Sequence, residues 1–155
     1  MYEGNYLANR LRASSSNNPE RIFARKLDGS TISYQAFFEG AEAFAKALLL
    51  KGLKPNDRVA VQTDKSTEAI QLYIGTILAG GVFLPLNTAY TTFEVSYFIE
   101  DASPSVFVCD PANHAELEPV AKSLGVMDVE TLDAAGSGSL SDLAKGMNSE
   151  PFDAV

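Results

Sequence analysis

The segment ILAGGVFLPLNTAYTTFEVSYFIEDASPSVFVCD, Ile77 to Asp110, decides the fold of this chain. It begins with the end of an apolar helix, and the short apolar run Val82–Leu86 that follows is typical of a strand. Thr91-Thr92-Phe93-Glu94 predicts a capping box, which starts a helix that must end before Pro104. Val106–Cys109 is a continuous apolar run, typical of a strand that is covered on both faces. A strand, a helix and a second strand in succession indicate a parallel sheet.

The flanking segments extend this alternation in both directions. Upstream, Asp28-Gly29-Ser30 separates two short runs and predicts a hairpin of residues 21–27 and 31–33. Ser33 is the predicted N-cap of the next helix, and Gly52 is its predicted C′ glycine. The other predicted elements are strands at 58–63 and 126–132, helices at 66–80 and 113–124, and a helical turn at 140–145. The sequence therefore predicts an α/β layered domain with a mainly parallel sheet, flanking helices and a small N-terminal hairpin.

Length and composition restrict the classes of protein that fit this sequence. A chain of 155 residues with 46% hydrophobic content can bury one core but is short for two ordinary domains. It contains no run of 18 apolar residues and no apolar signal segment at its start, which argues against a membrane span and against secretion. Its single cysteine, Cys109, cannot form an internal disulfide, so we expect a cytoplasmic protein.

The charge of the chain is negative and unevenly distributed. The formal net charge of −8 disfavours nucleic acid as a partner, because duplex binding needs a basic surface. A loose basic cluster lies near the start of the chain: Arg10, Arg12, Arg21, Arg25 and Lys26. The cluster is either a site for an anion or solvated charge on a turn and an edge strand, which is the usual role of scattered charges.

Two segments with glycines admit both a functional and a structural interpretation. The run AAGSGS, residues 134–139, invites comparison with a phosphate loop, but such loops need a third glycine or a Gly-Lys-Ser/Thr ending. We predict a surface linker at 134–139 instead. Gly80 and Gly81 join a predicted buried helix directly to a strand, where glycine permits tight packing and a positive φ. Their predicted role is structural.

Nucleophilic and metal-binding side chains are few. His114 is the single histidine and has Asp110 and Glu116 as acidic neighbours, but Asp-Pro-Ala-Asn-His is typical of the start of a helix. Cys109 lies in a predicted buried strand without a basic neighbour that would lower its pKa. A polar turn without a nearby base is predicted for Ser14, Ser15 and Ser16. We therefore predict no catalytic residue and no metal ligand in this chain.

Thr88 and Tyr90 are the remaining candidates for ligand contact. They follow the predicted strand Val82–Leu86, and α/β sheets place ligands beside the carboxyl ends of their strands. The alternative interpretation is that Tyr90 packs over the rim of the sheet.

Two ordered motifs resemble those of a known family. Thr31–Phe37 (TISYQAF) resembles the first core motif of the adenylate-forming superfamily of acyl-CoA synthetases, peptide-synthetase adenylation domains and luciferases. Leu78–Asn87 (LAGGVFLPLN) resembles the second. Between them, Leu53–Ala60 is similar to the G-L-x-x-G-D-x-V segment of the family, with Asn56 where glycine is common. The runs that make the chain most similar to malonyl-CoA synthetases are Leu84–Pro111 and Gly138–Asp142.

The resemblance implies that residues 1–155 form a single partial domain, the N-terminal portion of an ATP-dependent acid–CoA ligase. In this family an acid attacks ATP to give an acyl-adenylate and diphosphate, and CoA then displaces AMP, while Mg²⁺ neutralises the phosphates. The phosphate loop, the ribose-binding aspartate and the catalytic lysine of the family lie downstream of the matched motifs. ATP, CoA and Mg²⁺ are thus expected to bind the longer enzyme, and this portion is expected to be inactive alone. Gly80, Pro85 and Asn87 match the family as scaffold positions.

Two other functions remain open from the sequence. One is a free-standing module that binds CoA or a nucleotide through the basic cluster, and the other is a structural module that completes the enzyme in trans. If the chain is part of a longer enzyme, its partner is the C-terminal remainder of that enzyme. The helices at 34–51 and 66–80 then have apolar faces for this remainder, and we expect the isolated chain to self-associate through them.

Overall fold

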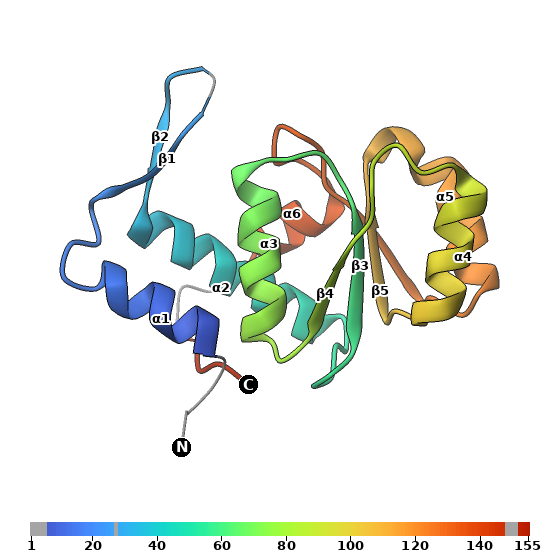
Figure 1. Ribbon diagram of the computed structural model, residues 1–155, viewed down its shortest axis with the longest axis horizontal. Helices are drawn as coiled ribbons and strands as arrows, with labels where there is room; N and C mark the ends of the chain where they lie inside the picture. The colour runs from blue at the N-terminus through green and yellow to red at the C-terminus, as the bar shows by residue number, and fades with distance from the viewer. Residues whose placement is uncertain (1–5, 27, 148–151) are drawn as a thin grey trace.

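The computed structural model describes residues 6–26, 28–147 and 152–155 (Figure 1). Along the chain the elements are α1 (Tyr6–Ser15), β1 (Ile22–Arg25), β2 (Thr31–Ser33), α2 (Tyr34–Leu50), β3 (Arg58–Gln62), α3 (Thr67–Leu78), β4 (Val82–Pro85), α4 (Thr92–Ala102), β5 (Val106–Cys109), α5 (Pro111–Ser123), β6 (Asp128–Thr131) and α6 (Ser139–Lys145). A parallel sheet of four strands has the order β4-β3-β5-β6, and β1 pairs with β2 as an antiparallel hairpin. The predicted α/β class and the predicted hairpin are confirmed.

The sheet has a core on each of its faces. The sheet is seen edge-on in Figure 1, with α2, α3 and α6 on one side and α4 and α5 on the other. Because side chains alternate along a strand, Val59 and Val61 of β3 join the α2–α3 core, whereas Ala60 joins the α4–α5 core. All residues of β5 are buried, as predicted for a strand covered on both faces.

The chain changes direction across the sheet between β3 and β5. After β3, the chain passes through α3 to β4, and α4 then carries it back past β3 to β5, from which α5 leads on to β6. The helices that follow the neighbouring strands β3 and β5 therefore lie on opposite faces. Such a switch point at the carboxyl ends of strands is where open α/β sheets bind ligands. In Figure 1 this end of the sheet is uppermost.

The predicted helix caps are present. Ser33 Oγ accepts a hydrogen bond from the Ala36 N–H at 3.2 Å and begins α2. Thr91 and Glu94 form the predicted capping box of α4, in which each side chain satisfies the backbone N–H of the other residue. Gly52 follows α2 with a φ of 84°. Local side-chain chemistry thus sets these helix boundaries, and the sequence reveals it.

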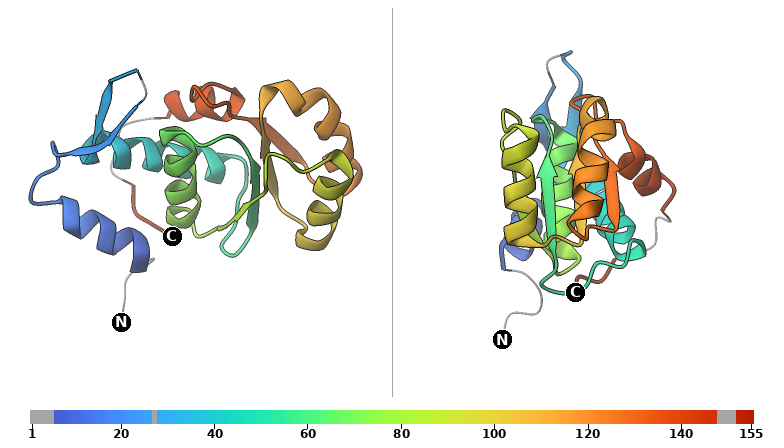
Figure 2. Two further views of the ribbon diagram at one scale, coloured as in Figure 1. Left: turned by 45° about the horizontal axis from the view of Figure 1, so that its top comes forward. Right: turned by 90° about the vertical axis from the view of Figure 1, so that its right-hand side faces the viewer.

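The hairpin β1–β2 projects from the α2 side of the molecule (Figure 2). Lys26 Nζ at its end lies 2.7 Å from Glu68 Oε1 in the first turn of α3. Phe23 of β1 stacks on Phe37 of α2, with ring centroids 3.9 Å apart. The Lys26–Glu68 ion pair and the stacking of Phe23 on Phe37 therefore contribute to the attachment of the hairpin to α3 and α2.

Several predicted boundaries were wrong. No helix was predicted for residues 6–15, and Ser14 and Ser15 were predicted to lie in a polar turn, but both belong to α1. Half of the residues of this helix are polar, so its apolar periodicity is weak. α5 begins at Pro111 instead of residue 113, because Asp110 accepts a hydrogen bond from the Ala112 N–H and proline is favoured in a first turn. β6 spans fewer residues than the predicted strand at 126–132.

Asn56 shows how the chain accommodates its departure from the family segment. Its φ is 71°, in the left-handed region where glycine is common and where asparagine is also tolerated. The Asn56 N–H donates to the carbonyl oxygen of Gly80, whose own φ is 79°. The two turns before β3 and β4 therefore support each other, and the predicted structural role of Gly80 is confirmed.

Candidate functional site

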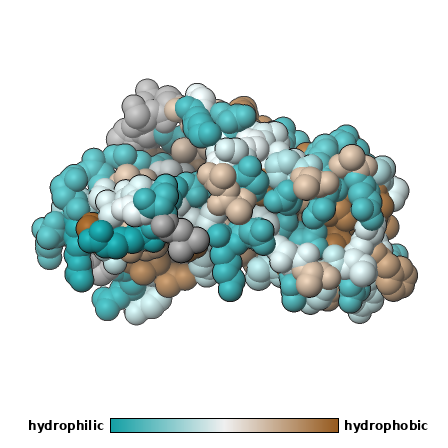
Figure 3. Space-filling model, turned by 90° about the horizontal axis from the view of Figure 1, so that it is seen from above, coloured by the Kyte–Doolittle hydropathy of each residue, from teal (hydrophilic) through white to brown (hydrophobic). Residues whose placement is uncertain are grey.

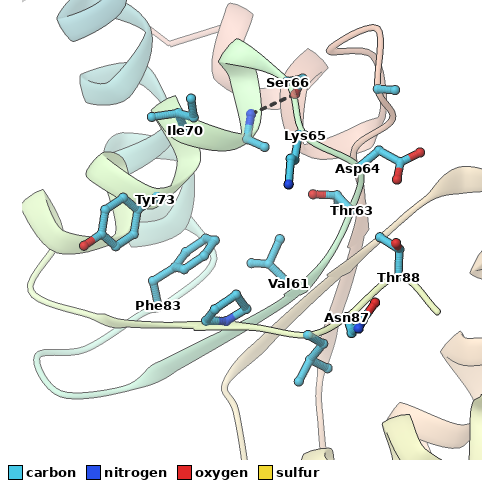
Figure 4. Close-up of a pocket in the computed structure, with 14 residues that line it drawn as sticks. Val61, Thr63, Asp64, Lys65, Ser66, Ile70, Tyr73, Phe83, Asn87 and Thr88 are labelled. Atoms are coloured by element: carbon cyan, nitrogen blue, oxygen red, sulfur yellow. Dashed lines mark hydrogen bonds between the residues drawn. The ribbon is translucent and has the colours of Figure 1, made fainter. Parts of the chain in front are cut away.

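A groove of about 960 Å³ lies beside the carboxyl ends of β3 and β4, on the side of the sheet that α3 covers (Figure 4). Its polar rim comes from two loops. The loop after β3 contributes Thr63, Asp64 and Lys65, and the loop after β4 contributes Asn87 and Thr88. The groove therefore opens at the end of the sheet where ligands of α/β proteins bind.

The rest of the groove is apolar. Ile70 and Tyr73 of α3 form one wall, and Phe83 and Pro85 of β4 form the other, with Val61 between them (Figure 4). The rings of Tyr73 and Phe83 meet edge to face, with centroids 5.1 Å apart. An apolar groove with a polar rim at one end can accept an apolar group and hold a polar one at its mouth.

Gln62, which the sequence analysis did not single out, fixes the loop after β4. Its side chain is 2% exposed, and Nε2 donates to the carbonyl oxygens of Asn87 at 3.0 Å and Tyr90 at 3.3 Å. Asn87 Oδ1 in turn accepts a hydrogen bond from the Ala89 N–H at 3.0 Å. The available sequence signal was a polar residue directly after the apolar run Val59–Val61. Gln62 is therefore a positioning residue for the rim.

The structure separates the two candidates of this loop. Thr88 is exposed and lines the groove. Tyr90 stacks its ring on Phe98, with centroids 5.0 Å apart and an angle of 17°, and it packs with the α4–α5 core on the opposite face. The alternative interpretation of Tyr90, packing over the rim of the sheet, is the one that the structure supports. Thr88 remains a candidate for ligand contact.

The glycine-containing loop before α6 is occupied by its own carboxylate. Asp133 Oδ1 accepts hydrogen bonds from the N–H groups of Ala135 and Ser137, both at 2.8 Å. Gly136 approaches Glu68 so closely that a Cβ there would lie 2.5 Å from the Glu68 carboxyl carbon. The amides that a phosphate would need thus already serve Asp133, and two negative charges stand beside the loop. This arrangement does not fit a phosphate loop.

The candidate metal ligands do not converge. Asp110 caps α5, Glu116 accepts a hydrogen bond from the Thr92 hydroxyl, and His114 Nδ1 lies 3.6 Å from Glu118 Oε2. Among the described residues, no three His, Cys, Asp or Glu side chains gather as a metal site would require. The residues of this portion alone therefore do not fit Mg²⁺.

Cys109 is buried in β5, as predicted. Burial raises the pKa of its thiol to about 12, and the nearby Asp110 adds to this effect. A neutral, buried thiol is a poor nucleophile.

The basic cluster is divided among different partners. Arg12 pairs with Glu42 and lies 5.8 Å from the centroid of the Phe38 ring, whereas Lys26 pairs with Glu68. Burial tends to raise the pKa of Glu68, but hydrogen bonds from Lys26 and Thr67 outweigh it and hold this pKa below its ordinary value. Two members of the cluster therefore neutralise acids of their own chain.

The upper surface of the molecule, at the carboxyl ends of the strands, is mainly hydrophilic to intermediate in character, with separate hydrophobic areas (Figure 3). Within the part of the chain that the structure describes, no helix is both long and apolar enough to cross a membrane.

Comparison with known proteins identifies the family. The family model of AMP-binding enzymes matches residues 11–151. This chain belongs to the AMP-binding enzyme family. The predicted membership is thus confirmed, and the fold matches the N-terminal domain of adenylate-forming enzymes.

Solved structures of family members resemble this chain over nearly its whole length. MatB from Rhodopseudomonas palustris, a malonyl-CoA synthetase, is 41% identical with a TM-score of 0.88, and the match covers 96% of this chain and 30% of that one. The ATP-bound form of MatB from the same bacterium gives a TM-score of 0.87 over 94% of this chain and 29% of its own.

Curated relatives in the AMP-binding family include peptide synthetases. Tyrocidine synthase 1 of Brevibacillus parabrevis is 27% identical over 129 residues, which are 82% of this chain and 12% of the synthase. A dimodular nonribosomal peptide synthase of Bacillus subtilis is 33% identical over 90 residues, 58% of this chain and 4% of that protein. This chain therefore spans a small part of the length of its relatives.

Proposed function

We propose that this chain is the N-terminal portion of a longer cytoplasmic acid–CoA ligase that forms malonyl-CoA, AMP and diphosphate from malonate, ATP and CoA through an acyl-adenylate. The observation that carries the proposal is the 41% identity with MatB over 96% of this chain. The peptide synthetases match less well, with 27% identity over 82% of the chain for tyrocidine synthase 1. Two early family motifs, residues 31–37 and 78–87, also support the proposal.

In the longer enzyme the residues of this portion position the site and do not perform the chemistry. Gln62 holds the Asn87–Tyr90 loop, and the loops after β3 and β4 form the polar rim of the groove. ATP, CoA and Mg²⁺ bind to the complete enzyme, with Mg²⁺ neutralising the phosphates. The isolated chain, residues 1–155, is inactive, because the phosphate loop, the ribose-binding aspartate and the catalytic lysine expected from the family lie downstream of the matched motifs.

The substrate is tested by diphosphate release from ATP with the full-length product of the gene. We expect release that depends on malonate and is much weaker with acetate, benzoate or amino acids. Release that depends on an amino acid would contradict the malonate assignment and favour an adenylation domain like those of the peptide synthetases.

The alternative function is a free-standing module that binds CoA or a nucleotide without catalysis. Isothermal titration calorimetry of the isolated chain with ATP and with CoA separates the two. We expect no heat of binding at millimolar ligand, because Arg12 and Lys26 are already paired with acids. A saturable heat would support the module and contradict the proposal of an inert portion.

A further inference from the structure

The side-chain amide of Gln62 has its orientation fixed by the loop after β4. Its Nε2 donates to the carbonyl oxygen of Asn87 at 3.0 Å and to that of Tyr90 at 3.3 Å. Exchanging the nitrogen and the oxygen of this amide would place Oε1 against two carbonyl oxygens, and none of the three oxygens carries a proton to donate. The two bonds to the loop therefore determine which end of the amide is Oε1.

Oε1 of this amide lacks a hydrogen-bond donor. Gln62 is 2% exposed, and its Oε1 is fully buried. Among the residues that the structure describes, it is the only buried side-chain nitrogen or oxygen without a hydrogen-bond partner. Buried polar atoms are otherwise paired with protein or with ordered water, because an unpaired one costs free energy. A donor therefore belongs beside Oε1.

The neighbours of Gln62 on the sheet do not supply a strong donor. Side chains alternate along a strand, so Gln62 shares a face of β3 with Ala60, which belongs to the α4–α5 core. In the parallel register of β3 and β5, the partner of Gln62 is Cys109, a buried member of the same core. Alanine has no side-chain donor, and a thiol is a weak one. The donor for Oε1 must therefore come from elsewhere.

A water molecule fits the polar groups that meet here. Buried waters bind where several polar atoms of the protein converge. The Tyr90 carbonyl oxygen has two lone pairs, and the bond from Gln62 Nε2 uses one of them. A water between the two residues can donate one proton to Oε1 and the other to this carbonyl oxygen. Burial raises the pKa of the Cys109 thiol to about 12, so the thiol keeps its proton and can donate weakly to the same water.

We propose that a buried water molecule is bound to Gln62 Oε1 and, together with the two bonds from Nε2, fixes the loop of residues 87–90 for the ligase reaction. Thr88, which lines the groove, lies between the two residues whose carbonyl groups Gln62 holds. Gln62 is thus a positioning residue that acts through both ends of its amide. The proposal rests on the proposed function, because the rim serves a reaction only in the complete enzyme.

A high-resolution crystal structure of the full-length product tests the water directly. We expect an enclosed water whose oxygen lies about 2.7–2.8 Å from Gln62 Oε1. Well-defined density without a water beside Oε1 would overturn the proposal. A protein N–H or a group of a bound substrate in the place of the water would overturn it as well. This measurement needs neither a variant nor activity.

Gln62→Glu in the full-length product tests the positioning role, and Gln71→Glu is the matched control. Gln71 is also buried, and its Nε2 donates to the carbonyl oxygens of Ala36 and Phe37, both at 3.3 Å, between α3 and α2. It does not line the groove. In both variants an ionised carboxylate has no proton for the two carbonyl oxygens, whereas the neutral carboxyl has one. Diphosphate release is measured from about pH 6 to about pH 8.

The surroundings of Gln62 favour the neutral form of a carboxyl introduced there. Burial, with smaller contributions from Asp110 and Glu118, raises the pKa of the neighbouring Cys109 thiol, and the same influences raise the pKa of a carboxyl. We expect kcat/KM of Gln62→Glu, corrected for the folded fraction, to be roughly tenfold or more below wild type at the alkaline end. It should approach wild type as the pH falls, because the proton restores one bond to the loop.

The corrected ratio of Gln71→Glu to wild type should stay constant across this range, because its carbonyl partners lie away from the rim. A ratio for Gln62→Glu that does not change with pH, or an equal change for Gln71→Glu, would overturn the positioning role. If Gln62→Glu does not fold, the wild-type water decides the proposal. Malonate-dependent release by the wild-type protein reports on the proposed function separately, and a wild type that uses another acid is assayed with that acid.

Discussion

At the scale of single residues, Gly75 determines how closely α2 and α3 approach. A Cβ at this position would lie 2.6 Å from the Ala41 carbonyl oxygen and 2.9 Å from Phe44 Cβ. In the sequence, a glycine inside a helical pattern only weakens the prediction of a helix. The need for glycine at position 75 arises from the backbone of α2, which packs against it in the folded chain. This need was therefore not predictable from the sequence.

We predict that Gly75→Ala lowers the free energy of unfolding by about 1–3 kcal/mol, the usual effect of overpacking a core. The loss outweighs the gain of up to about 1 kcal/mol in helix propensity. Urea unfolding of the isolated chain measures it. Gly146→Ala is the control, because a Cβ there meets nothing closer than 3.4 Å and the φ is −79°. Equal stability of the Gly75→Ala and wild-type chains would show that the helices can separate without loss.

At the scale of elements, the sequence was most informative where local chemistry defines an end. The caps at Ser33 and Thr91, the glycine after α2 and the buried strand β5 were predicted and confirmed. α1 was missed because few of its apolar residues, chiefly Ala8 and Leu11, pack into the α2–α3 core, which gives only a short apolar pattern in the sequence. The order of the strands and the groove were not predicted, because both arise from segments that are far apart along the chain.

The capping box of α4 gives a prediction at this scale. Thr91→Ala removes the acceptor of the Glu94 N–H, and we expect a loss of about 1 kcal/mol in the free energy of unfolding. Urea unfolding measures the loss. Ser96→Ala is the control, because its hydroxyl bonds only the Phe93 carbonyl within the same helix and alanine favours a helix. A Thr91→Ala variant as stable as Ser96→Ala would argue that the cap does not stabilise α4.

The ion pair between the hairpin and α3 predicts a dependence on pH. The folded-state pKa of Glu68 is below its ordinary value of 4.5, so the charged form stabilises the fold. This contribution is fully present above the unfolded pKa and is lost as pH falls through the folded pKa. Wild type should therefore be more stable than Glu68→Gln at neutral pH, and the difference should vanish in strong acid.

Thermal unfolding of both proteins between pH 3 and 7 measures this difference, with Glu100→Gln, an exposed position on α4, as the control. A difference between wild type and Glu68→Gln that does not change with pH would contradict the role assigned to the Lys26–Glu68 pair.

At the scale of the whole molecule, the sequence predicted the α/β class and the family, and the structure adds a groove beside the carboxyl ends of β3 and β4. Gln62 and the wall of α3 and β4 could not be placed from spacing, because the rim is formed by loops that follow two separate strands. Several exposed apolar residues lie on or beside β4 and α4: Ile70 at the groove, Val82 at the start of β4, and Phe93 and Tyr97 on α4. Exposed apolar residues of this kind favour association.

These surfaces predict that the isolated chain self-associates. The sedimentation coefficient should rise with protein concentration, and Ile70→Lys together with Val82→Lys should reduce the rise, because charge opposes burial of these exposed apolar positions. A control double substitution at exposed polar positions, Lys54→Ala together with Glu100→Ala, should leave the rise unchanged. A single monomeric species at all concentrations would refute the prediction.

The most direct test of the central claim is malonate-dependent diphosphate release from ATP, measured for the purified isolated chain beside the full-length product of the gene. We predict release by the full-length protein and none by residues 1–155, because the phosphate loop and the catalytic lysine expected from the family lie downstream of the matched motifs. Malonate-dependent release by residues 1–155 alone would contradict the claim that this chain is a positioning portion of a larger ligase.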